Sequence, residues 1–132
     1  MAMIKKVMII DDEPEVRSVL GDFTELYFQK MGGECRVELL DSPVEALFCL
    51  TDGRAGYAAI LLDVRMPLMG GDDVFRAILS MDTAMAARVV FVTGYADDVK
   101  RHYPDRELTV LMKPFSFEAF SQVMTKVLQP AA

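Results

Sequence analysis

The sequence is poor in the residues on which several kinds of site depend. Its 132 residues include one histidine, two cysteines and no tryptophan. Cys35 and Cys49 form no CxxC motif, which argues against a zinc site or a thiol redox centre and favours two reduced cysteines in the core. Catalysis by a Ser-His-Asp or Cys-His arrangement would have to recruit His102 from the polar stretch 97–103, which we regard as the weaker interpretation.

Positive charge and long apolar runs are also scarce. The 14 Lys and Arg are outnumbered by 20 Asp and Glu, and this net charge of −6 argues against direct binding of nucleic acid. No apolar run approaches the ~18 residues of a membrane-spanning helix. Residues 1–6 are not followed by the apolar segment of a signal peptide. We therefore expect a cytoplasmic protein that contacts neither nucleic acid nor a membrane.

What is present suits one globular domain over residues 1–132. Hydrophobic residues make up 52% of the chain and charged residues 26%, which is typical of a folded domain rather than a disordered one. A chain of this length buries about two-thirds of its unfolded surface, enough for a core.

Strand-like and helix-like patterns alternate along the whole chain. Short apolar runs predict five strands, at residues 3–10, 35–40, 57–64, 88–93 and 108–112. Between and after them, helical spacing and helix-start residues predict helices that begin near Pro14, Pro43, Gly71 and Ser116, the second of them ending near Asp52. The stretch 94–103 is polar and only weakly helical.

This alternation predicts an α/β fold built on a five-stranded parallel sheet with helices on both faces. Right-handed crossovers and strands that are apolar on both sides are typical of a doubly wound sheet. In such sheets ligands bind beyond the carboxyl ends of the strands, so the residues that end strands are the candidates for function.

The strand ends carry a distinctive set of side chains. Asp11 and Asp12 follow the first strand, Asp63 ends the third, Thr93 ends the fourth and Lys113 follows the fifth. Three carboxylates at one edge require a cation, and oxygen ligands without thiolate or imidazole favour Mg²⁺ or Mn²⁺. An ammonium and a hydroxyl beside such an ion predict a phosphoryl-binding site with a carboxylate nucleophile.

Each of these residues also has an ordinary interpretation. Asp11 and Asp12 could simply favour the positive end of the first helix. Thr93 could be a β-branched strand residue and Lys113 a solvated surface lysine. It is their occurrence together, at the ends of neighbouring strands, that favours the phosphoryl site.

Four motifs make the chain resemble a response-regulator receiver domain, the phosphoacceptor module of two-component signalling, of the chemotaxis-regulator-like type. They are Ile9–Glu13, Leu61–Pro67, Val92–Ala96 and Met112–Phe115. The spacings between their central residues are 51 from Asp12 to Asp63, 30 from there to Thr93, and 20 from there to Lys113. The resemblance covers essentially the whole chain and implies a flavodoxin-like sheet with strand order 2-1-3-4-5.

The resemblance implies a role for each residue of this set. Asp63 would accept the phosphoryl group, Lys113 and Thr93 would contact its oxygens, and a cis peptide would join Lys113 to Pro114. The metal, Mg²⁺ or Mn²⁺, would be bound by the carboxylates of Asp12 and Asp63, by the backbone carbonyl of Arg65, and through water by Asp11.

The resemblance is incomplete at the residues that would report phosphorylation. In the family an aromatic residue stands three positions before the lysine and moves together with the threonine, whereas this chain has Val110 there. We expect the switch to involve Thr93 and Val110, and the output face to include Gly94, Tyr95 and Tyr103. Arg65 and Tyr95 would flank the phosphoryl group and slow its hydrolysis, unless both side chains simply point to solvent.

Three functions remain open at this point. The first is a signalling phosphoacceptor, which is not an enzyme in the usual sense. It would be phosphorylated by a sensor histidine kinase or a histidine phosphotransferase domain and would act on a downstream effector. We expect it to be a monomer or a weak dimer. The second is a phosphatase with an aspartate nucleophile, although such enzymes place the nucleophile after the first strand in a D-x-D pattern. The third is a phosphate-independent interaction module.

Overall fold

The computed structural model describes residues 4–51, 56–67 and 69–128. Five strands form one parallel sheet, and their bounds are β1 Ile4–Ile10, β2 Glu34–Leu40, β3 Tyr57–Asp63, β4 Val89–Thr93 and β5 Thr109–Met112. The strand order is β2-β1-β3-β4-β5, as predicted from the sequence.

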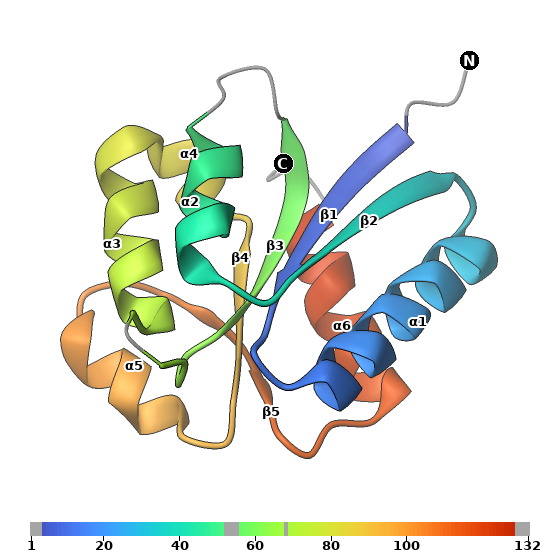
Figure 1. Ribbon diagram of the computed structural model, residues 1–132. Helices are drawn as coiled ribbons and strands as arrows, with labels where there is room; N and C mark the ends of the chain where they lie inside the picture. The colour runs from blue at the N-terminus through green and yellow to red at the C-terminus, as the bar shows by residue number, and fades with distance from the viewer. Residues whose placement is uncertain (1–3, 52–55, 68, 129–132) are drawn as a thin grey trace.

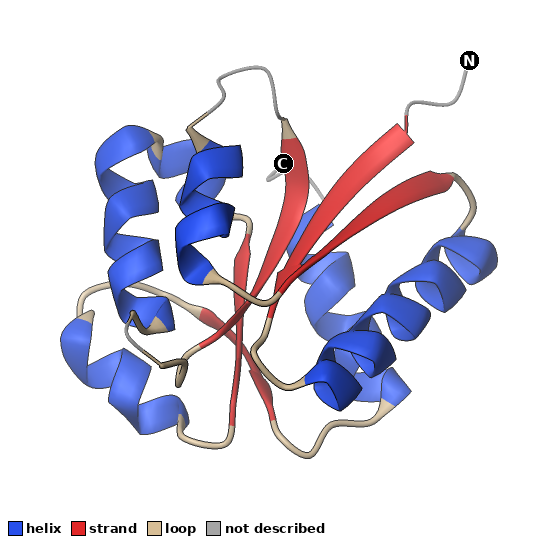
Figure 2. Cartoon of the chain, viewed as in Figure 1, coloured by secondary structure: helices blue, strands red, loops and turns tan. Residues whose placement is uncertain are grey.

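Helices cover both faces of the sheet. Their bounds are α1 Pro14–Met31, α2 Pro43–Leu50, α3 Gly71–Met81, α4 Thr83–Ala86, α5 Ala96–His102 and α6 Phe117–Leu128. One face is covered by α1 and α6, and the other by α2 to α5 (Figures 1 and 2). Within the described ranges, none of these helices has the length and apolar character required to cross a bilayer.

The core has two halves because side chains of a strand alternate between the faces of the sheet. On β1, Val7 and Ile9 pack with α1 and α6, whereas Met8 and Ile10 pack with α2 and α3. The strands β3 and β4 alternate in the same way and are apolar on both faces. The continuous apolar runs in the sequence are therefore explained by burial on both sides of the sheet.

Three predicted strand boundaries are wrong by one residue, each making the predicted strand too long. Arg88 does not begin a strand, because its N–H donates to the carbonyl of Met85 in the turn after α4. Val64 follows β3 instead of ending it, and its carbonyl accepts from Gly71 N–H. Leu108 precedes β5, whose first paired residue is Thr109. The predicted residues Met3 and Asp52 lie outside the described residues.

Two further expectations need correction. The four-residue helix α4 was not expected; it is capped by Asp82, whose carboxylate accepts from two N–H groups of the first turn. The cysteines are free but only half-buried, and Cys35 and Cys49 pack at the margins of the core. The weakly helical stretch 94–103 contains α5, of which Val99 is the buried residue.

Candidate functional site

The carboxyl ends of β1, β3, β4 and β5 meet at one edge of the sheet. The register pairs Ile10 with Leu62, the residue before Asp63, and pairs Thr93 with Met112, the residue before Lys113. Lys113 N–H donates to the carbonyl of Thr93 at 2.9 Å, so β5 leaves the sheet directly beside the end of β4. The parallel ladder thus brings together side chains that are far apart in the sequence.

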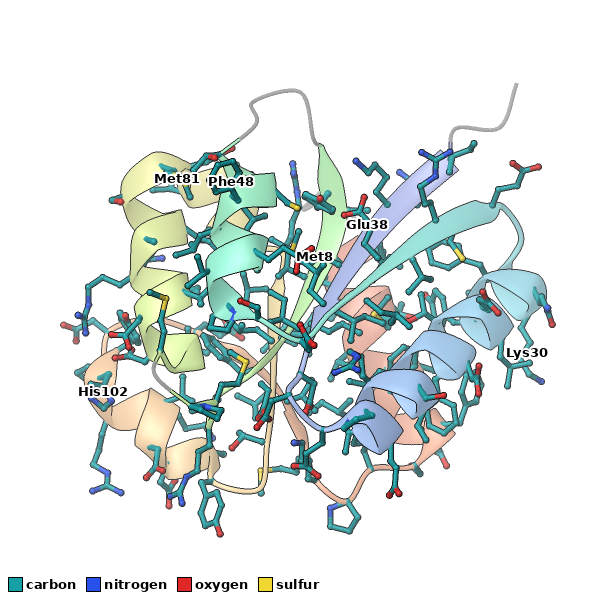
Figure 3. All side chains as sticks on the ribbon, viewed as in Figure 1. Met8, Lys30, Glu38, Phe48, Met81 and His102 are labelled. Atoms are coloured by element: carbon teal, nitrogen blue, oxygen red, sulfur yellow. The ribbon has the colours of Figure 1, made fainter. Side chains whose placement is uncertain are left out.

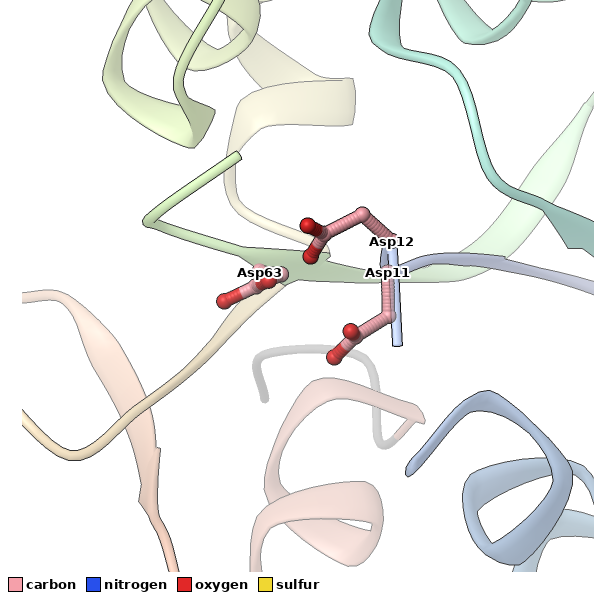
Figure 4. Close-up of side chains that lie close together, drawn as sticks. All are labelled: Asp11, Asp12 and Asp63. Carbon is pink, nitrogen blue, oxygen red and sulfur yellow. The ribbon is translucent and has the colours of Figure 1, made fainter. Parts of the chain in front are cut away.

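Three aspartates form an acidic cluster at this edge. Oxygens of Asp11, Asp12 and Asp63 all lie within 4.8 Å of one another, and their side chains are directed toward one space (Figure 4). Asp11 is fully buried and Asp63 is 4% exposed. The structure thus brings together the three aspartates that the sequence predicts to meet at this edge.

Lys113 lies between two of these carboxylates. Its Nζ is 3.3 Å from Asp11 Oδ2 and 3.4 Å from Asp63 Oδ1, and a third contact reaches Glu13 Oε1 at 3.7 Å. The peptide bond from Lys113 to Pro114 is cis. One ammonium therefore faces two buried carboxylates, which leaves negative charge in excess.

Burial and the neighbouring charges together shift the pKa values of the cluster. Burial, and then the charge of Asp11, raise the pKa of Asp63 from its ordinary value of 3.8 to about 7. Burial likewise raises the pKa of Asp11. Burial lowers the pKa of Lys113, but the carboxylates of Asp63 and Asp11 outweigh it and the net shift is upward. A bound cation would remove the cost of ionising the two aspartates.

The donor set fits Mg²⁺ or Mn²⁺. Among the described residues the cluster offers carboxylate oxygens without thiolate or imidazole, and hard divalent ions prefer such ligands. Burial is the main cause of the raised pKa values of Asp11 and Asp63, so ionising both aspartates is costly without a bound cation. The cluster therefore could hold a divalent metal.

The loop after β3 requires a close backbone approach. A Cβ on Gly71 would lie 2.3 Å from the carbonyl oxygen of Asp63 and 2.9 Å from the Cα of Val64. The first residue of α3 thus packs against the backbone that carries Asp63, and only glycine leaves room for it. The sequence showed a Gly-Gly pair at this helix start, but this contact depends on the fold.

Thr93 is buried at the end of β4. Its Oγ1 accepts a hydrogen bond from the N–H of Tyr95 at 2.9 Å and keeps its own proton to donate elsewhere. The hydroxyl is therefore tied to the turn that leads into α5. Gly94 and Tyr95 of this turn are exposed.

The side chains of Arg65 and Tyr95 contact each other at the rim. The guanidinium lies 3.5 Å from the centroid of the Tyr95 ring, and Nη2 of Arg65 pairs with Asp98 Oδ2 at 2.7 Å. The Arg65 side chain is 57% exposed and Tyr95 is 54% exposed, so each keeps about half of its surface in contact with solvent. Their contact nevertheless connects the β3–α3 loop to α5, and the part played by Asp98 was not foreseen.

Val110 and Tyr103 lie on the side of the sheet that α3 covers. Val110, half-buried, pairs with Phe91 in the register. The ring of Tyr103 packs edge-on against Phe75 with centroids 5.0 Å apart. The hydroxyl of Tyr103 is buried, so this residue contributes less to an exposed face than the sequence suggested. His102 extends outward from the end of α5, exposed (Figure 3).

Two residues of the site were missed by sequence reasoning. Asp98 on α5 forms an ion pair with Arg65 of the β3–α3 loop. Arg17 on α1 donates a hydrogen bond to the carbonyl of Asp11. Neither occupies a strand end, and in the sequence both have the appearance of ordinary charged residues on helix surfaces. Only the tertiary arrangement reveals these contacts.

Comparison with solved structures supports the fold. A response regulator receiver domain protein from Clostridium thermocellum superposes with a TM-score of 0.76 at 22% identity, covering 94% of each chain. The receiver domain of the sensor histidine kinase PA1611 from Pseudomonas aeruginosa PAO1 superposes with a TM-score of 0.75 at 20% identity, covering 96% of this chain and 98% of that one. The latter structure has a magnesium ion coordinated in its active site cleft.

Comparison of sequences identifies the family. The chain is 30% identical over 106 residues to the probable methanogenesis regulatory protein FilR2 of Methanothrix harundinacea. The aligned region covers 76% of this chain and 68% of FilR2. It is 26% identical to the transcriptional regulatory protein MalR of Bacillus subtilis, of which it spans about half. The family model for the response regulator receiver domain matches residues 7–125. The chain thus belongs to the response regulator receiver domain family.

Proposed function

We propose that residues 1–132 form one receiver domain that accepts a phosphoryl group on Asp63. The donor is the phosphohistidine of a sensor histidine kinase or a histidine phosphotransferase domain. A carboxylate oxygen of Asp63 forms the new O–P bond while the N–P bond breaks, and the imidazole leaves as a neutral group after taking a proton. The position of Lys113 Nζ, between Asp63 and Asp11, is the observation that carries this proposal.

The residues around Asp63 have separate tasks in this reaction. Phosphoryl transfer depends mainly on alignment and on neutralising charge. Lys113 neutralises an oxygen of the incoming group, and the free proton of Thr93 donates to another. The N–H of Arg65 donates to Asp63 Oδ1 at 3.4 Å and orients the other oxygen for attack. Asp12, Asp63 and the carbonyl of Arg65 would hold Mg²⁺, with Asp11 acting through water, and the ion would supply further charge neutralisation.

Mass spectrometry of the intact protein tests the proposal. After incubation with acetyl phosphate and Mg²⁺ we expect the mass of one phosphoryl group on the wild type, and none with EDTA or in Asp63→Asn. Asp22→Asn, which changes an exposed aspartate of α1, is the matched control and should be labelled like the wild type. An unlabelled wild type would favour the interaction module. Multiple turnover of a phosphomonoester would favour the phosphatase.

The contacts of Thr93 suggest how phosphorylation is reported to a downstream partner. When Thr93 Oγ1 moves toward the phosphoryl group, it draws the N–H of Tyr95 with it and displaces the start of α5. Val110 supplies no aromatic ring for this signal, so the turn at Gly94 and Tyr95 carries it. This part of the proposal makes the exposed surface of α5 the output face.

Arg65 and Tyr95 should lengthen the life of the phosphorylated state. They lie two residues beyond Asp63 and Thr93 respectively, their side chains stack on each other, and Arg65 pairs with Asp98. There they would obstruct water that approaches the phosphoryl group from the rim. We expect Arg65→Ala/Tyr95→Ala to lose its phosphoryl group about tenfold faster, which corresponds to ~1.4 kcal/mol. Arg101→Ala is the control, since Arg101 pairs with the same Asp98 but lies outside the stack. Equal rates of hydrolysis, followed by intact mass after removal of acetyl phosphate, would refute this role.

A further inference from the structure

Asp11 is held at each of its polar groups. Its N–H donates to the carbonyl of Leu40 at 3.1 Å, and its Oδ1 accepts from the N–H of Glu13 at 2.9 Å. Its Oδ2 faces Lys113, and its carbonyl accepts from Arg17 Nη1 at 2.7 Å. The first three contacts use backbone groups or the lysine already described. The contact from Arg17 is the one made by a side chain with no assigned role.

The carbonyl that Arg17 holds belongs to the peptide group that joins Asp11 to Asp12. The orientation of this peptide sets the direction in which the chain leaves β1, and with it the direction of the Asp12 side chain. Arg17 reaches the carbonyl from the first turns of α1, where its own backbone N–H donates a hydrogen bond to the carbonyl of Glu13. A guanidinium donating to a carbonyl forms a charge-assisted hydrogen bond, which is stronger than a neutral one.

We propose that Arg17 is a positioning residue for Asp12. By fixing the peptide between Asp11 and Asp12, it keeps the Asp12 carboxylate directed toward Asp63 before a metal binds (Figure 4). The inference rests on the proposed function, because it gives Asp12 the task of holding Mg²⁺. Outer residues that orient metal ligands commonly change metal affinity by ~10–100-fold when they are replaced.

The charge of Arg17 and its positioning act on metal binding in opposite directions. The Arg17 guanidinium contacts the Asp11 carbonyl beside the acidic cluster, and its positive charge repels Mg²⁺, so removing the charge alone would tighten binding. Removing the hydrogen bond to the Asp11 carbonyl frees the Asp12 peptide and weakens binding. Weaker Mg²⁺ binding on replacement of Arg17 therefore indicates a positioning residue, and tighter binding indicates that only its charge matters.

Titration calorimetry with Mg²⁺ on the whole chain tests the inference. We expect Arg17→Gln to bind Mg²⁺ about tenfold more weakly than the wild type. Arg17→Lys, which keeps the charge and one donor, should fall between the two. Lys30→Gln removes one positive charge from the far end of α1 (Figure 3) and should leave the affinity unchanged. Unchanged or tighter binding by Arg17→Gln would overturn the inference.

A second measurement does not depend on the metal. Arg17 holds the carbonyl of Asp11, and the Glu13 N–H donates to Oδ1 of the same residue. Because Asp11 is held less firmly in Arg17→Gln, amide hydrogen exchange in EDTA should be faster at Glu13 in this variant. Unaltered exchange at Glu13 in both Arg17 variants would also contradict the positioning role. If the wild type binds Mg²⁺ and is labelled by acetyl phosphate, and Arg17→Gln binds Mg²⁺ equally well, only this inference is refuted. A wild type that neither binds nor is labelled would refute the proposed function.

Discussion

Replacing Lys113 with alanine is expected to slow labelling by acetyl phosphate about 100-fold or more. The ammonium lies 3.3 Å from Asp11 and 3.4 Å from Asp63. Without it, the incoming phosphoryl group would meet the carboxylates with less positive charge to neutralise its oxygens. Loss of one group placed to stabilise the charge of a transition state typically costs ~100–1,000-fold in rate. The initial rate of mass gain at saturating Mg²⁺ measures the effect.

The matched control for this experiment is Lys126→Ala. Lys126 lies on α6 and pairs with Glu107, so its replacement removes an equal charge at a distance from the site. We expect this variant to be labelled at the rate of the wild type. Labelling of Lys113→Ala within about threefold of the wild-type rate would contradict the role assigned to the lysine.

Replacing Asp63 with asparagine is expected to stabilise the protein at pH 8 in EDTA. The pKa of Asp63 is about 7 in the folded protein, compared with 3.8 in an unfolded chain. The folded state therefore binds more protons than the unfolded state between these two values. The stability of the wild type should fall as pH rises through this window, and the full loss is present above pH 7.

The size of this effect follows from the width of the window. Each pKa unit corresponds to ~1.4 kcal/mol, so a window of about three units makes the cost of ionising Asp63 about 4 kcal/mol. Asparagine avoids this cost but loses the attraction to Lys113. We therefore expect Asp63→Asn to raise the free energy of unfolding at pH 8 by about 2 kcal/mol, measured by urea titration. At pH 4 the two proteins should differ little.

Mg²⁺ provides an internal check on this prediction. A ligand that binds only the folded state stabilises it, by ~2.7 kcal/mol at one hundred times its dissociation constant. Adding Mg²⁺ should therefore raise the stability of the wild type and narrow its difference from Asp63→Asn. Asp22→Asn should follow the wild type under all conditions. Equal stabilities of the wild type and Asp63→Asn at pH 8 in EDTA would contradict the account of charge in the cluster.

The parallel strands and the gathering of the acidic cluster could be predicted because both depend on local patterns, whereas the order of the strands followed from the family resemblance. The apolar run before Asp63 marks a strand buried on both faces, and a parallel sheet brings the carboxyl ends of its strands to one edge. Each of the five strand-end residues at this edge is therefore placed by a single strand assignment. This logic fixes which residues meet without knowledge of the helices.

The contacts at the rim could not be predicted because they depend on exposed side chains. Arg65 has partners in Tyr95 and Asp98, which lie 30 and 33 positions later in the chain. Helix α4 was missed since four residues are too few to show a helical period, although Asp82 is a good capping residue. The role of Gly71 required the distance from its backbone to that of Asp63.

The most direct measurement is to identify the residue that carries the phosphoryl group. Borohydride reduces an acyl phosphate on aspartate to the alcohol, so a phosphorylated Asp63 would become homoserine. After labelling, reduction and proteolysis, the account predicts homoserine at position 63 by peptide mass mapping, and unmodified aspartate at positions 11 and 12. Homoserine at another position, or at none in a protein that has gained a phosphoryl group, would contradict it.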